Sequence, residues 1–170
     1  MQTKNLALVF DALKILKPKM DFRLVIVGDG EELKSYRAMT EALGIADRVL
    51  FVGEITDRNF LKAFYLRADL FVFPSLFDTA SLCPIEAAAF GLPTLLVEGS
   101  ATSETIKDGF SGYAVPAEAN AWAEKIYSAL SDRAALSAVR ENCRKYVYRS
   151  WKDVVQEAEK KYDEILSGRK

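Results

Sequence analysis

The chain alternates between two hydrophobic patterns. Short, nearly continuous apolar runs that lead into glycine, proline or polar residues are typical of strands buried on both faces of a parallel sheet. In chain order these runs are FRLVIVGDG, VLFVG, LFVFPS and TLLV, and YAV is a candidate for one more. The stretches between them repeat apolar residues three and four positions apart, which predicts amphipathic helices.

Capping signals mark the ends of these helices. The helix predicted over 5–17 stops at Pro18. Glu31-Glu32 opens the next helix and Gly44 closes it, because carboxylates suit the positive end of a helix and glycine suits the left-handed position beyond its last residue. Asp57 is the expected N-cap of a helix in DRNFLKAFYLRA, and a further helix is expected in PIEAAAFG.

Strands that alternate with helices indicate right-handed crossovers and a parallel sheet covered on both faces. After Gly99 the polar segment SATSETIKDGFSGY predicts a long loop or a single helical turn. Three more helical patterns follow, near 118–130, 132–147 and 151–166. We therefore expect one α/β domain over 1–170, a Rossmann-like, doubly wound parallel sheet with C-terminal helices.

Composition excludes several classes of function. With 170 residues, 50% of them hydrophobic, the chain is long enough for one domain with a substantial core. A net charge of −1 provides no long-range attraction to nucleic acid, and no nucleic-acid partner is expected. The sequence contains no histidine, which excludes Ser-His-Asp hydrolysis and most zinc catalysis by this chain.

The cysteines and the hydropathy pattern predict a cytoplasmic protein. Cys83 and Cys143 lack a CxxC spacing and are expected to be reduced thiols. No apolar run approaches the roughly 20 residues of a membrane span, and no signal-peptide pattern opens the sequence.

Glycines follow two of the predicted strands. In doubly wound sheets, ligands bind in the crevice beyond the carboxyl ends of the strands. Gly28 and Gly30 follow the first strand and Gly53 the second, and the missing side chains would let a ligand approach the backbone. A tight turn alone also explains them, so these glycines are weak evidence for a ligand.

The third strand end, PSLFDTASLCPIEAAAFGLP at 74–93, carries more chemistry. Pro84 suits the first position of a helix that begins near Cys83, whose free amides would attract an anion such as a diphosphate. Glu86 could accept two hydroxyl hydrogen bonds from a vicinal diol such as ribose, and Asp78 could bind hydroxyls at the other end of the ligand. Alternatively, Glu86 only complements the helix dipole and Asp78 is an ordinary loop residue.

This stretch resembles the donor-site signature of retaining, nucleotide-sugar glycosyltransferases of family 4, which have the two-domain GT-B fold. The matching residues, in order, are Pro74-Ser75, Asp78, Glu86-Ala87-Ala88-Ala89 and Gly91-Leu92-Pro93. The flanking segments KNLALVFDAL, LVIVGDGEE, VLFVGEI, ADLFVFPS and IKDGFSGYAV agree as well, so the resemblance covers nearly the whole chain.

The resemblance implies a role for each matching residue. Lys4 would pair with the donor diphosphate, Asp78 would hold hydroxyls of the transferred sugar, and Glu86 would bind the ribose diol. The backbone would supply the rest of the donor site. Gly28 and Gly30 would border the nucleotide cleft, the base would meet Val52, Gly53 and Ile55, and amides of Ala80, Ser81, Leu82 and Cys83 would line the sugar and phosphate.

The resemblance also implies a UDP-linked donor and metal-independent transfer without a cofactor, and no DxD motif occurs. An arginine-bearing first strand and an N-terminal acceptor domain, both present in the family, have no counterpart in this sequence. We therefore expect this chain alone to bind the donor weakly and to transfer nothing. If the absent strand belongs in the middle of the sheet, its loss leaves unpaired strand edges.

Some positions depart from the family pattern. Asp78 is one methylene shorter than the usual glutamate, and Ala80-Ser81 replaces a common Phe-Gly pair. The variant is most similar to the branch that glucosylates diacylglycerol, which implies a lipid acceptor and a place at the inner face of a membrane. A basic cluster could contact an anionic bilayer or simply be a solvated helix face: Arg140, Arg144, Lys145, Arg149 and Lys152.

Three other functions also suit parts of this pattern. A dinucleotide-dependent oxidoreductase needs GxGxxG, and the third glycine is missing. A GT-B nucleotide-sugar epimerase is expected to use histidine, which is absent. A non-catalytic nucleotide-binding or regulatory domain stays open. Tyr146, Tyr148 and Trp151 are expected to pack in the core or against another domain, and the apolar stripe of the last helix is a candidate surface for that domain.

Overall fold

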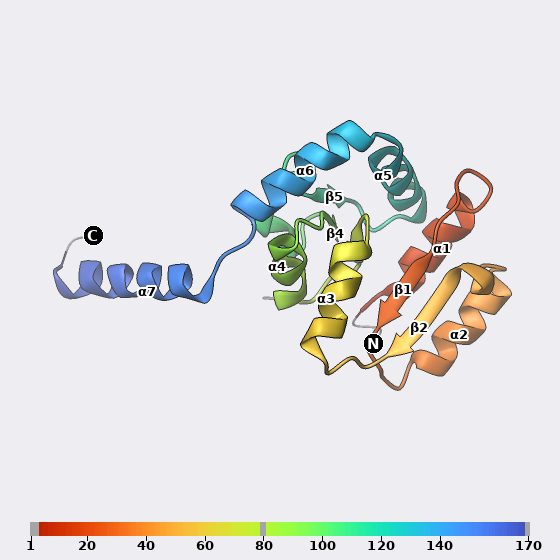
Figure 1. The fold of residues 1–170 in the computed structure, drawn as a ribbon, viewed down its shortest axis with the longest axis horizontal. Helices are drawn as coiled ribbons and strands as arrows, with labels where there is room; N and C mark the ends of the chain where they lie inside the picture. Colours follow the sequence, from red (N-terminus) through yellow and green to blue (C-terminus); the bar gives the residue numbers. More distant parts are fainter. Residues whose placement is uncertain (1–3, 79–80, 169–170) are drawn as a thin grey trace.

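The computed structural model describes residues 4–78 and 81–168, and its helix bounds agree with the sequence patterns to within one or two residues (Figure 1). The strands are β1 (Leu24–Val27), β2 (Val49–Gly53), β3 (Phe71–Phe73), β4 (Thr94–Val97) and β5 (Tyr113–Val115). The α-helices are α1 (Leu6–Leu16), α2 (Leu33–Ala42), α3 (Arg58–Arg67), α4 (Leu82–Ala89), α5 (Ala119–Ser131), α6 (Arg133–Tyr146) and α7 (Trp151–Leu166). Two short 3₁₀ turns are η1 (Ala46–Arg48) and η2 (Ala101–Thr105), the second lying in the polar segment that follows Gly99.

Local capping chemistry explains why the helix bounds could be predicted. The Asp57 carboxylate accepts a hydrogen bond from the Asn59 amide at 2.8 Å, which confirms Asp57 as the N-cap of α3. Ser150 and Asp153 form a reciprocal capping box at the start of α7. Each cap satisfies amides of the first helical turn that have no acceptor within the helix.

All strand pairs are parallel, but the described residues form two sheets and not one. β1 pairs with β2, and β3, β4 and β5 form a separate sheet in that order. β4 is paired on both sides and buried along its whole length, whereas β1, paired on one side, is half-buried and its last residue is exposed. β1 and β3 therefore each present an edge without a strand partner in the described part of the chain.

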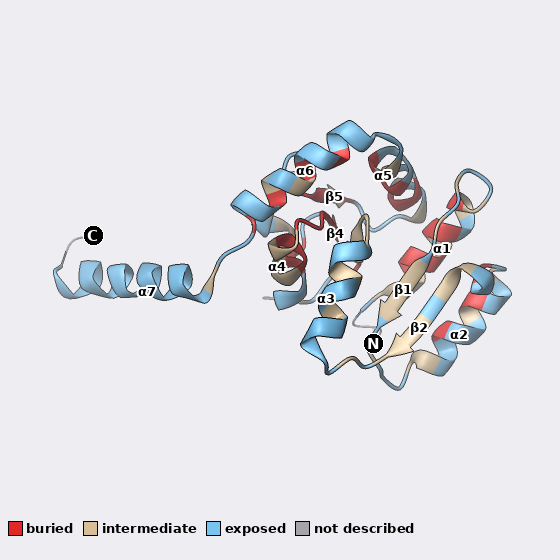
Figure 2. Ribbon diagram, in the orientation of Figure 1, coloured by how far each residue is buried: buried red, intermediate tan, exposed pale blue. Residues whose placement is uncertain are grey.

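One hydrophobic core nevertheless joins the two sheets. Phe10 of α1 and Trp122 of α5, both fully buried, belong to the same cluster as Ile26 of β1 and Leu95 of β4. Figure 2 shows the buried segments gathered on α1, α5 and β4. Side-chain packing from α1 and α5 thus joins the two sheets, which no strand pairing connects in the described residues.

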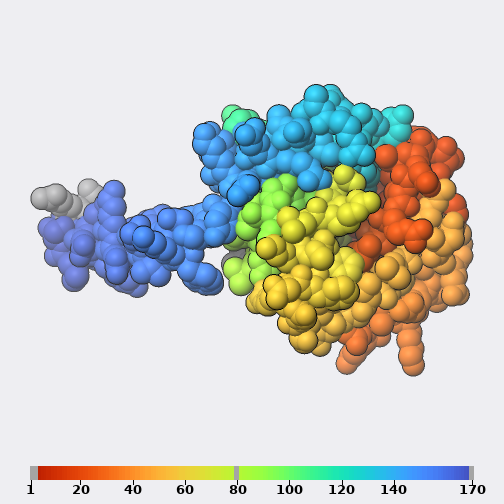
Figure 3. Space-filling view, viewed as in Figure 1, coloured from red at the N-terminus to blue at the C-terminus, as the bar shows by residue number. Residues whose placement is uncertain are grey.

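The last helix projects from the rest of the chain as an arm (Figures 1 and 3). Every described residue of α7 is exposed, and its apolar residues include Trp151 at 74% and Ile165 at 73% relative exposure. Tyr146 and Tyr148 are also exposed. Burial of these aromatic residues in the core of this chain was therefore wrongly expected, while their packing against another domain stays a prediction. None of the helices in the described ranges is long and apolar enough to cross a membrane.

Candidate functional site

The carboxyl ends of β1 and β2 are joined through two glycines. The Gly28 amide donates a hydrogen bond to the Gly53 carbonyl at 2.8 Å. Gly28 has φ +130° and Gly53 has φ +75°, conformations that side chains rarely adopt, and a Cβ at Gly28, Gly30 or Gly53 would meet no atom within 4 Å. The backbone therefore lies open at this strand end, next to the half-buried Val52 and Ile55.

Lys4 and Asp78 lie together at the carboxyl end of β3. Lys4 Nζ lies 2.9 Å from Asp78 Oδ2 and 3.1 Å from Oδ1. A hydrogen bond from Ser75, together with the Lys4 ammonium, lowers the pKa of the Asp78 carboxyl. Thr102 in η2 fixes the loop backbone by donating to the Asp78 carbonyl at 3.1 Å. The structure thus brings together two predicted site residues that are 74 positions apart.

The start of α1 explains how Lys4 reaches this loop. Asn5, the N-cap of α1, has φ 50° in the left-handed region, and its side-chain amide donates to the Pro74 carbonyl at 3.4 Å. This contact ties the beginning of α1 to the end of β3. Lys4, immediately before it, therefore faces the loop that carries Asp78.

α4 begins at Leu82, close to the predicted start near Cys83. Ser81 is the N-cap in an extended conformation, and its side chain makes no capping hydrogen bond. Leu82 and Cys83 are exposed, while Pro84 is buried and is the third residue of α4, so its expected place at the first helical position was wrong. Ala80, which was expected to supply another amide, lies outside the described residues.

Glu86 has two partners on α3 that the sequence analysis missed. Arg58 Nη1 donates to Glu86 Oε1 at 3.0 Å, and the Tyr65 hydroxyl donates to Glu86 Oε2 at 3.2 Å. Burial raises the pKa of Tyr65, and the nearby charges of Cys83 and Glu86 raise it further. The sequence signals were faint: Arg58 directly follows the N-cap of α3, and Tyr65 is a polar-tipped aromatic residue on an amphipathic helix.

Glu86 and Tyr65 line an open groove of about 630 Å³ between α3, α4 and the segment that leads into α7. Asp78 and Lys4 are not among the described residues that line it, so this groove does not bring the two predicted carboxylates together. Its lining is mainly apolar and comprises Arg58, Asn59, Leu61, Lys62, Tyr65, Leu82, Ile85, Glu86, Ala89, Phe90, Tyr148, Arg149, Ser150, Trp151 and Val154.

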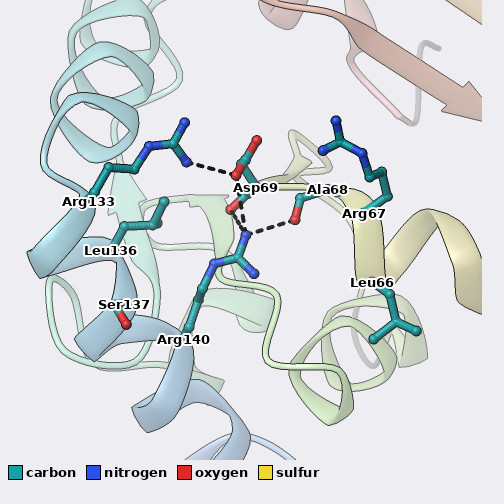
Figure 4. A pocket seen from close by; sticks show the side chains of 8 residues that line it. All are labelled: Leu66, Arg67, Ala68, Asp69, Arg133, Leu136, Ser137 and Arg140. Carbon is teal, nitrogen blue, oxygen red and sulfur yellow. Dashed lines mark hydrogen bonds and ion pairs between the residues drawn. The ribbon is translucent and has the colours of Figure 1, made fainter.

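A second concavity, of about 370 Å³, lies between the end of α3 and α6 (Figure 4). There Asp69 pairs with Arg133 at 2.9 Å and with Arg140 at 3.6 Å, and Arg140 donates to the Ala68 carbonyl at 2.8 Å. Because these charged groups pair with one another, their contacts attach α6 to the segment before β3. Within the predicted basic cluster, Arg140 is engaged here and Arg149 pairs with Glu157.

Comparison with known proteins points to one family. The sequence profile described as "Glycosyl transferases group 1" matches residues 1–150. A lipopolysaccharide core biosynthesis mannosyltransferase, LpsB of Rhizobium meliloti, is 30% identical over 148 residues, which is 82% of this chain and 41% of that protein. The chain spans about two fifths of the length of the curated relatives it matches.

Solved structures show the same fold. The C-terminal domain of a group 1 family protein, LpcC of Francisella tularensis, superposes with a TM-score of 0.76 at 23% identity, covering 86% of this chain and 79% of that one. HepE of Anabaena in complex with UDP-glucose superposes with a TM-score of 0.82 at 22% identity, covering 98% of this chain and 46% of that one.

Proposed function

Since this chain belongs to the family of group 1 glycosyl transferases and has the fold of a GT-B C-terminal domain, we propose that it binds a nucleotide-diphosphate-sugar donor, UDP-linked, for retaining transfer to an acceptor. The observation that carries the proposal is the Lys4–Asp78 pair at the carboxyl end of β3, on the loop that precedes the N-terminus of α4. A cation and the N-terminus of a helix suit a diphosphate. An ionised carboxylate next to them suits sugar hydroxyls.

The proposal gives each of these residues a role. Lys4 pairs with the diphosphate, and Asp78, whose pKa is lowered by Ser75 and Lys4, accepts hydrogen bonds from the sugar. Charge that develops on the leaving diphosphate is met by Lys4 and backbone amides without a metal ion. Glu86 binds the ribose, and the backbone of Val52, Gly53 and Ile55 faces the base. The resemblance of the fold to HepE, whose structure contains UDP-glucose, supports a UDP-linked donor.

The acceptor and part of the donor site are proposed to lie outside this chain. The chain covers about two fifths of the length of its relatives. β1 and β3 each lie at the edge of a sheet, and that edge has no strand partner among the described residues. An additional parallel strand between β1 and β3 would satisfy both edges and make one continuous sheet. Transfer then needs a second domain that holds the acceptor, and the 170-residue chain alone is expected to bind the donor without transferring sugar.

Titration of the chain with UDP tests the proposal. We expect UDP to raise the thermal unfolding midpoint more than NAD does, because ligand that binds only the folded state stabilises it. Lys4→Met should weaken UDP binding roughly 3- to 10-fold by calorimetry, because the Lys4 side chain is 57% exposed and its contact is worth about 1 kcal/mol. Lys14→Met removes an exposed lysine from the other end of α1 and should leave the affinity unchanged.

The contrary outcomes are equally clear. If no nucleoside diphosphate among UDP, GDP and ADP binds, the proposed function is wrong. A larger midpoint shift with NAD than with UDP would contradict the UDP-linked donor. Equal losses in Lys4→Met and Lys14→Met would remove Lys4 from the donor site.

A further inference from the structure

The two oxygens of the Glu86 carboxylate have partners of very different character. Arg58, which donates to Oε1, is 81% exposed as a side chain, whereas Glu86 itself is 34% exposed. Tyr65, which donates to Oε2, is half-buried. An exposed arginine pairs weakly because water screens the charges and the long side chain loses rotational freedom. Tyr65 loses much less rotational freedom when it forms its hydrogen bond, because its ring is already held by packing.

The Tyr65 ring is fixed from two sides. It stacks on Phe90 at the end of α4, with centroids 5.5 Å apart and an interplanar angle of 13°. It also meets Phe71 of β3 edge to face, with centroids 6.2 Å apart. The hydroxyl position is therefore set relative to both the helix that carries Glu86 and the strand that leads to Asp78.

This hydroxyl remains a donor throughout the ordinary pH range. Burial raises the pKa of Tyr65 above the usual value for a phenol, so the group keeps its proton. Each carboxylate oxygen has two acceptor positions. Tyr65 and Arg58 occupy one on each oxygen, which leaves capacity on both for two hydroxyls of a ligand.

We infer that Tyr65 is a positioning residue for Glu86: its hydroxyl holds the carboxylate in the orientation that receives a vicinal diol. This inference rests on the proposed function, in which Glu86 binds the ribose of the donor nucleotide. Without Tyr65 the carboxylate would rotate more freely and would have to be ordered when the ligand binds, which weakens binding. Arg58 is a replaceable counter-ion in this arrangement.

Tyr65→Phe tests the inference, because it removes the hydroxyl and keeps the ring between Phe71 and Phe90. The probes are UDP and 2′-deoxy-UDP, which lacks one hydroxyl of the diol. We expect the dissociation constant for UDP to rise roughly 3- to 10-fold, as for the loss of one hydrogen bond, and that for 2′-deoxy-UDP to change less than twofold. The ratio of the two constants within one variant is insensitive to a general loss of folded protein.

A double-mutant cycle shows whether Tyr65 acts through Glu86. Glu86→Gln should reduce the preference for UDP over 2′-deoxy-UDP, and adding Tyr65→Phe in that background should reduce it no further. Arg58→Met should change UDP binding about twofold at most. Tyr127→Phe, a tyrosine exposed on α5, is the matched control and should change neither constant.

The results that contradict the inference differ from those that contradict the proposed function. If wild-type chain discriminates UDP from 2′-deoxy-UDP and Tyr65→Phe does so equally well, the positioning role is wrong and the proposed function stands. The same conclusion follows if Tyr65→Phe weakens the binding of both nucleotides equally. It also follows if Tyr65→Phe reduces the preference for UDP as much in the Glu86→Gln background as in the wild-type chain. If wild-type chain binds neither of these nucleotides and also fails to bind GDP and ADP, both are wrong.

Discussion

Lys4 and Asp78 show how single residues at this strand end stabilise one another. Both side chains are partly exposed, 57% for Lys4 and 27% for Asp78, so the pair contributes within about 1 kcal/mol. Its identity could be predicted from the sequence because Pro74-Ser75, Asp78 and Lys4 form part of a recognisable motif. The roles of Tyr65 and Arg58 could not be predicted from the sequence, because their contacts with Glu86 span 21 and 28 positions and depend on how α3 packs against α4.

The lowered pKa of Asp78 gives a pH-dependent contribution to stability. Ionised Asp78 favours the folded state above about pH 4, the ordinary pKa of an unfolded aspartate, and this contribution is lost as the pH falls through the lower folded-state pKa. We therefore expect wild-type chain to lose more unfolding free energy than Asp78→Asn between about pH 5 and pH 2.5, measured by urea unfolding. The expected difference is below about 1 kcal/mol. Lys4→Met, which keeps the Ser75 bond, should fall between the two, and identical pH profiles would contradict this account.

At the scale of elements, caps and strand ends were predictable and strand pairing was not. Asp57 and the Ser150–Asp153 box act within one helical turn, so the local sequence contains all their partners. Pairing of a strand depends on which neighbours the whole chain supplies, and an apolar run such as LVIV reads the same whether one edge or both are paired. The local sequence therefore predicted the strands, while unpaired strand edges within the sheet were expected only from the family resemblance.

The joint between β1 and β2 offers a matched pair of glycines. Gly28 has φ +130° and donates to the Gly53 carbonyl, whereas Gly30 has no such φ, and a Cβ would meet nothing at either position. Gly28→Ala should destabilise the chain by about 1–3 kcal/mol through backbone strain alone. Gly30→Ala should be within about 0.5 kcal/mol of wild type or slightly more stable, because it lowers the entropy of the unfolded chain.

Urea unfolding of both variants makes the measurement, and equal effects would contradict the role of φ. The pair also separates turn from ligand site. If Gly30→Ala leaves stability unchanged but weakens UDP binding, open backbone at Gly30 serves a ligand. If UDP binding is unchanged too, a tight turn is a sufficient explanation for this glycine.

At the scale of the whole molecule, packing from α1 and α5 joins the parts while α7 stands apart. The amphipathic pattern of α7 predicted a partner for its apolar stripe, and the structure shows that the described residues do not provide one. Sequence periodicity reveals that a face is apolar and does not reveal what covers it. This is why the arm was foreseen as a helix with an apolar stripe, while packing of that stripe against another domain stays a prediction.

Removal of residues 151–170 should therefore leave the remaining chain almost as stable as before, within about 1 kcal/mol, since exposed residues contribute little to folding. Phe10→Ala, at a fully buried position of α1, should instead cost about 3–5 kcal/mol. Urea midpoints of the two variants provide the comparison. A large loss on truncation would mean that α7 packs on the rest of the chain.

The two tryptophans occupy opposite environments, one in the shared core and one on the arm. Trp122 is fully enclosed and Trp151 is 74% accessible, so their fluorescence emits at different wavelengths and only the second meets a dissolved quencher such as iodide. One fluorescence experiment thus records two events separately: unfolding of the core through Trp122, and shielding of Trp151 from the quencher when another surface covers the arm.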